Sequence, residues 1–113
     1  MNIQILGTKK SNNTKKAERF FKERNIKYHF RNFTEKGISK GELDNIKNAI
    51  PLEELLDKEG KEFKKRNLAY MVYDIEKELL ENPLLFKIPI VRNGRKVTLG
   101  YQSDIWKKWI LEG

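Results

Sequence analysis

The stretch that decides the fold is Ile3-Gln4-Ile5-Leu6-Gly7-Thr8-Lys9-Lys10-Ser11-Asn12-Asn13-Thr14-Lys15-Lys16-Ala17. Its first residues alternate weakly between polar and apolar, which predicts a short strand over Asn2–Leu6. The polar residues Ser11–Asn13 can cap the first amides of a helix. Apolar residues then recur at helical spacing, so the stretch predicts a strand, a polar turn and a helix that ends near Asn25.

The middle of the chain reads as mostly helical. A second short strand is expected at Tyr28–Phe30, and Ser39 with Glu42 forms a capping box that opens a helix. Another helix is expected after Pro51, with Gly60 at its end. The segment Lys61–Asn67 reads as a charged connection, and Asp74 can cap a helix that runs to about Glu81.

The last third predicts a hairpin and a helix. Ile88–Val91 is an apolar strand, Asn93-Gly94 is a strong hairpin signal, and Lys96–Leu99 is the return strand. A terminal helix begins at Ser103 or Asp104, and its expected apolar side holds Ile105, Trp106, Trp109 and Ile110. The tryptophans and phenylalanines fall on helical apolar stripes, so we expect them in the core.

The order of the expected elements is β-α-β, several helices, β-β and α. This order predicts an α/β, thioredoxin-like fold of the glutaredoxin type: a four-stranded mixed sheet with a helical insertion at about 39–82. A chain of 113 residues has room for one modest core, so we expect a single domain over 1–113. No apolar run reaches the roughly 20 residues of a membrane-spanning helix, so no membrane contact is expected.

The net charge of +8 is unevenly distributed. Residues 1–31 hold nine Lys and Arg against Glu18 and Glu23, whereas the rest of the chain is nearly balanced. A basic region around the first loop and helix suits a phosphate-bearing or acidic partner. The alternative is a solvated, lysine-rich helix face that keeps the protein in solution.

The chain resembles the ArsC/Spx family of thioredoxin-fold proteins, which includes arsenate reductase-like and YffB-like members. The resemblance covers nearly the whole chain. It rests on four segments in order: the first strand and helix, the segment 55–65 (LLDKEGKEFKK), the segment 82–91 (NPLLFKIPIV) and the segment 93–101 (NGRKVTLGY). The resemblance implies a cis peptide bond before Pro89, which would face the loop Thr8–Ser11.

The family's cysteines are missing. When the chain is aligned on Lys15-Lys16-Ala17, Ser11 and Thr14 stand at the two cysteine positions, and the chain contains no cysteine. Thiol chemistry needs a thiolate, so the family's mechanism is excluded and no catalytic residue is assigned. The arginines that hold the oxyanion in the family's reductases fall at Ile88, at Asp57 or Glu59, and near Tyr101.

An anion site could survive at the start of the first helix, because helix N-termini present amides and a partial positive charge. The alternative is that the polar side chains simply cap the helix. The candidate anion-binding residues are Lys9, Lys10, Ser11, Asn12, Asn13, Thr14 and Lys15. The only histidine, His29, reads as structural, no metal-ligand spacing appears, and no cofactor is expected.

The leading hypothesis is a redox-inactive, cytoplasmic ArsC/Spx-family protein that acts by binding. Its partner could be a protein, in a regulatory contact, since the resemblance to Spx implies action on RNA polymerase. One alternative is a divergent arsenate reductase or glutaredoxin-like oxidoreductase, against which the missing cysteine argues. A second alternative is a module that binds nucleic acid, phosphate or another anion through the basic first third.

Overall fold

The structure is a computed structural model that describes residues 1–113. The chain divides into two compact units, which we call the sheet unit (Met1–Asn32 with Ile88–Gly113) and the helical unit (Phe33–Lys87). That the whole chain acts as one domain stays a prediction. No helix in either unit has both the length and the apolar composition needed to cross a membrane.

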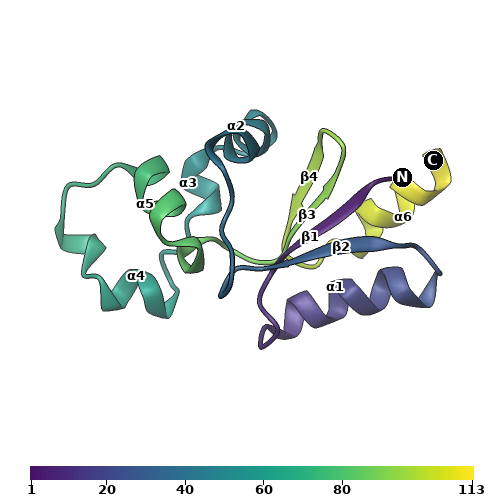
Figure 1. Cartoon of the computed structure of the whole chain (residues 1–113), viewed down its shortest axis with the longest axis horizontal. Coiled ribbons are helices and arrows are strands. Elements are labelled where there is room, and N and C mark those ends of the chain that lie inside the picture. The colour runs from purple at the N-terminus through teal and green to yellow at the C-terminus, as the bar shows by residue number, and fades with distance from the viewer. The chain divides into compact units, whose positions relative to one another are not determined.

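The sheet unit is a four-stranded mixed sheet with two helices (Figure 1). Its elements are β1 (Ile3–Gly7), α1 (Asn12–Glu23), β2 (Tyr28–Asn32), β3 (Ile90–Asn93), β4 (Lys96–Leu99) and α6 (Ser103–Glu112). The strand order is β2-β1-β3-β4, with β1 parallel to β2 and both other pairs antiparallel. The thioredoxin-like fold class and the mixed sheet are therefore confirmed.

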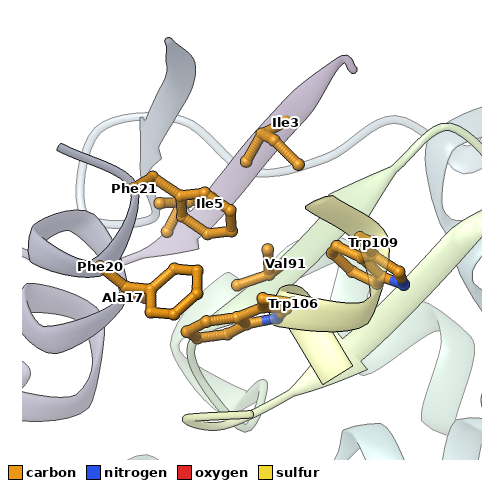
Figure 2. Packing of buried hydrophobic residues seen from close by; sticks show 8 residues of the cluster. All are labelled: Ile3, Ile5, Ala17, Phe20, Phe21, Val91, Trp106 and Trp109. Carbon is orange, nitrogen blue, oxygen red and sulfur yellow. The ribbon is translucent and has the colours of Figure 1, made fainter. Parts of the chain in front are cut away.

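One face of the sheet carries the core of this unit (Figure 2). Ile3, Ile5 and Val91 project from the strands toward α1 and α6, whose contributing side chains are Ala17, Phe20, Phe21, Trp106 and Trp109. The ring of Trp106 lies 5.3 Å from the rings of both Phe20 and Phe21, measured between centroids. Burial of these aromatics was expected, but Ile105 is 39% exposed and lies outside the apolar stripe.

The hairpin forms at the expected place, with two shifts in its boundaries. Asn93 belongs to β3 and pairs with Lys96, so the loop residues are Gly94 and Arg95. Gly94 has a φ of +61° and Arg95 has no positive φ, the pattern of a turn with glycine at its first central position. The strand begins at Ile90 rather than Ile88, because Pro89 has no amide to donate to a ladder.

The helical unit contains α2 (Lys40–Ala49), α3 (Leu52–Leu55), α4 (Lys61–Lys65), α5 (Ile75–Glu81) and the 3-10 turns η1 (Leu68–Tyr70) and η2 (Pro83–Leu85). Its core is formed by leucine, isoleucine and phenylalanine side chains. The phenyl rings of Phe33 and Phe86 lie 5.2 Å apart. An isolated antiparallel bridge joins Leu56 to Phe86.

Two boundaries in the helical unit were predicted correctly and two were wrong. The capping box of Ser39 and Glu42 and the cap from Asp74 both form. Gly60, however, does not end a helix: it is the N-cap of α4, in an extended conformation. The expected charged connection at Lys61–Asn67 is therefore partly helical, because Phe63 is buried and anchors α4 to the core.

Candidate functional site

The loop between β1 and α1 ends in Ser11, which is the N-cap of α1. The Ser11 hydroxyl accepts a hydrogen bond from the Thr14 amide at 3.2 Å, and its carbonyl accepts one from the Lys15 amide at 3.0 Å. The Ser11 side chain, which the resemblance predicts to stand at the family's first cysteine position, thus satisfies an otherwise unpaired first-turn amide. This geometry matches the capping alternative that the sequence left open.

Thr14 faces inward rather than toward the loop surface. Its side chain is fully buried, and its hydroxyl has no hydrogen-bond partner. The hydroxyl and methyl group lie over Gly7, at the end of β1. Since the Thr14 amide is also engaged by Ser11, the donors left for an anion at this helix end are the amides of Asn12 and Asn13.

The lysines around this helix end are exposed and have no carboxylate partner. Lys9, Lys10 and Lys15 form no ion pair, and the first turn of α1 contains no acidic residue. A cation near a helix N-terminus is destabilising by roughly 0.3–1 kcal/mol, since the helix dipole is positive there. The charge around the start of α1 is therefore positive, and a bound anion would neutralise part of it.

Pro89 lies at the same end of the sheet as this loop. The Ile88–Pro89 peptide bond is cis, in agreement with the expectation from the resemblance. Ile90 pairs with Leu6, which places buried Pro89 beside the end of β1. The Pro89 carbonyl accepts a hydrogen bond from the Gly100 amide at 2.8 Å and fixes the start of the hairpin.

None of the positions expected to hold oxyanion-binding arginines carries a cation. In the helical unit, Asp57 caps its own turn, because its carboxylate accepts the Glu59 amide at 3.2 Å. In the sheet unit, Ile88 is partly buried and Tyr101 is 43% exposed. The Tyr101 ring packs edge-on against Trp106, with 5.3 Å between centroids.

The structure brings together no group of side chains suited to catalysis by histidine or to metal binding. His29 is exposed on β2, and no three metal-ligating side chains lie together. Burial raises the pKa of the Tyr28 phenol, and so does its hydrogen bond to Glu18 at 2.9 Å. Glu18 is therefore engaged with Tyr28 rather than with the lysines of α1.

Sequence reasoning missed an exposed apolar segment in the helical unit. Tyr70 is 90% exposed, Met71 56% and Val72 103%; we call these three residues the apolar tip. Tyr70 is the last residue of η1, Met71 and Val72 follow it, and Asn67 precedes η1 with a φ of +56°. The sequence feature that could have indicated this segment is the apolar run Leu68–Tyr73, which belongs to no predicted helix or strand. Only the structure shows that Leu68 is buried while the next apolar residues are not.

Comparison with known proteins identifies relatives along nearly the whole chain. The family model described as ArsC family matches residues 6–109, which reach across both units. The global transcriptional regulator Spx 2 of Oceanobacillus iheyensis is 28% identical over 130 residues, a match that covers 99% of this chain and 96% of that protein.

Solved structures show the same fold. The YFFB protein superposes with a TM-score of 0.83 at 21% identity, over 95% of this chain and 97% of its own. The arsenate reductase from Vibrio cholerae gives a TM-score of 0.81 at 16% identity, over 96% and 97% of the two chains. At such low sequence identity, these structural similarities show only that the fold is shared. The family itself is shown by the family model, which spans almost the whole sequence. The chain belongs to the ArsC family.

Proposed function

We propose that this protein is a redox-inactive member of the ArsC family that acts by binding a protein partner. The observation that carries the proposal is Ser11. It stands at the family's cysteine position in a chain without cysteine, and its hydroxyl is engaged as the cap of α1. A serine hydroxyl needs an adjacent base to become a nucleophile, and the one histidine is exposed on β2 without a partner acid.

The missing arginines support the same conclusion. Tetrahedral oxyanion chemistry depends on preorganised positive groups around the anion. Here the corresponding positions are Ile88, Asp57 or Glu59, and Tyr101. The nucleophile and the clamp are lost together, which indicates a protein adapted to a role other than reduction.

We propose that this role is a regulatory protein contact inside the cytoplasm. Support comes from the relative Spx 2, which is named a global transcriptional regulator and matches this chain along nearly its full length. The resemblance to Spx implies RNA polymerase as the class of partner. The relative's name belongs to that protein, and the same role in this chain is our proposal.

The apolar tip is the surface that we propose for this contact. Exposed tyrosine, methionine and valine side chains in sequence are unusual for a surface loop, and tyrosine and methionine are enriched at the centres of protein interfaces. The exposed fractions of Tyr70 and Val72 leave almost their whole side chains available for burial by a partner. Burial of such anchors supplies most of the energy of many interfaces.

Affinity capture from lysate of the native host tests this proposal. The double variant Tyr70→Ser with Val72→Ser should recover the partner at least about tenfold less than the wild type, because loss of an aromatic anchor costs more than about 1.4 kcal/mol. Leu111→Ser is the control, since Leu111 is an apolar residue that is 87% exposed on α6, an element of the sheet unit. Equal recovery by the wild type and the tip variant would reject the tip as the contact.

A second candidate function is anion binding at the start of α1. Its supporting observation is the pair of first-turn amides at Asn12 and Asn13, surrounded by the exposed and unpaired Lys9, Lys10 and Lys15. Titration with inorganic phosphate at low salt should then shift backbone amide resonances only within residues 8–15. Uniform or absent shifts would leave a capped helix and nothing more.

A further inference from the structure

We propose that the groove between α1 and α6 is a binding site for a nucleoside phosphate, such as ATP. This site lies within the sheet unit and does not depend on the proposed protein contact. The groove has a volume of about 370 Å³, within the range of small-molecule sites. An isolated phosphate would fill only a small part of it.

The charge of the groove selects an anion. Lys16 and Arg19 line it from α1, Arg24 from the C-cap of α1, and Lys107 from α6. Glu23 is the only carboxylate among the lining residues. Lys16, Arg19 and Lys107 form no ion pair within the chain. Three unpaired cations that converge from two helices raise the local concentration of a multiply charged anion. Their number suits a di- or triphosphate better than a monoanion.

Two flat groups in the same groove suit a nucleobase. The guanidinium of Arg24 is held over the ring of Phe20, with its carbon 3.8 Å from the ring centroid, and its Nη1 donates to the Phe20 carbonyl at 3.0 Å. The outer plane of a guanidinium fixed in this way is a stacking surface for a base. Tyr101 adds a second ring, which is 43% exposed and packs against the ring of Trp106 in a T-shaped pair.

This preorganisation lowers the cost of binding, since the stacking groups need not be ordered by the ligand. Arg24 and Tyr101 are both held by core aromatics of the unit, Phe20 and Trp106. The phosphates would contact Lys16, Arg19 and Lys107, with the Ser103 hydroxyl as a further donor on the same wall. Nucleoside phosphates combine these two chemistries in one small molecule.

Titration of the full chain with ATP, followed by backbone amide resonances, tests the site. Saturable shifts should appear in residues 16–24 and 101–107, with a dissociation constant below about 1 mM. The double variant Arg19→Gln with Lys107→Gln should weaken binding at least about tenfold, and Tyr101→Ala several-fold. The charge-matched control Arg95→Gln with Lys108→Gln removes two exposed cations outside the groove and should leave the affinity within about twofold.

Three outcomes would overturn the proposal. The first is no saturable shift up to several millimolar ATP. The second is an identical response to inorganic triphosphate, which would show that the base contributes nothing. The third is a single-stranded oligonucleotide that binds far more tightly than ATP, with shifts spread along Lys15, Lys22 and Lys27; the groove would then be part of an extended nucleic-acid surface.

Discussion

Trp106→Ala should lower the free energy of unfolding by about 3–5 kcal/mol, the usual cost of removing a fully buried tryptophan. Its side chain has no exposed surface and contacts the rings of Phe20, Phe21 and Tyr101. Since small domains are stable by about 5–15 kcal/mol, this variant would lose a large part of its stability. Urea denaturation followed by circular dichroism measures the change.

A second variant separates packing from hydrogen bonding at this residue. The indole N–H of Trp106 donates to the buried Thr98 hydroxyl at 2.9 Å. Trp106→Phe keeps an aromatic ring but leaves Thr98 without this donor, so we expect an intermediate loss of about 1–3 kcal/mol. Leu111→Ala, at an exposed position of the same helix, should change stability by less than about 0.5 kcal/mol. A loss below about 1 kcal/mol for Trp106→Ala would show that this core is wrongly described.

Gly7→Ala should be the next most damaging of these changes, with a loss of about 1–3 kcal/mol from overpacking. A Cβ at position 7 would clash with the Thr14 hydroxyl and come within 2.9 Å of its methyl group. The Thr14 side chain is fully buried and has little room to move. The matched control is Gly41→Ala, whose Cβ would meet only the Ser39 hydroxyl at 3.9 Å; alanine there should be neutral or stabilising.

If this clash is the cause of the loss, a smaller side chain at position 14 should restore stability to the Gly7→Ala variant. Thr14→Ala removes the hydroxyl and the methyl group, the two groups closest to the new Cβ, and leaves only the Cβ of residue 14 at 3.2 Å; the deleted hydroxyl has no hydrogen-bond partner. The double variant Gly7→Ala with Thr14→Ala should therefore be more stable than Gly7→Ala alone, with a coupling energy of about 1 kcal/mol or more. Additive losses would mean that the two residues do not touch.

Local signals predicted the sheet unit well. Patterns of neighbouring residues predicted the capped start of α1, the hairpin near Gly94 and the aromatic stripe of α6. The structure contains each of these features. The wrongly predicted helix boundaries lie in the helical unit, where one residue type is compatible with two structures. Gly60 is compatible with the end of one helix or the start of the next, and the burial of Phe63, a long-range effect, decided for the start.

The candidate sites were less accessible to sequence reasoning. The inward orientation of Thr14 depends on the close approach of Gly7, which no spacing rule encodes. The groove between α1 and α6 combines Arg19 with Lys107, residues far apart in the chain, so it appears only once both helices pack on one face of the sheet. Ser11, by contrast, could be placed from the sequence, because a cap and its helix are neighbours in the chain.

The central claim is that this protein does not work by thiol chemistry, and a reductase assay tests it most directly. Purified protein is supplied with arsenate, glutathione, glutaredoxin and a coupled readout of NADPH consumption. We expect no turnover above the control without protein, because the chain has no cysteine to form a thiolate. Ser11→Cys should recover little, since Ile88, Asp57 and Tyr101 leave the oxyanion without a clamp. Turnover by the wild-type protein clearly above that control would contradict the account.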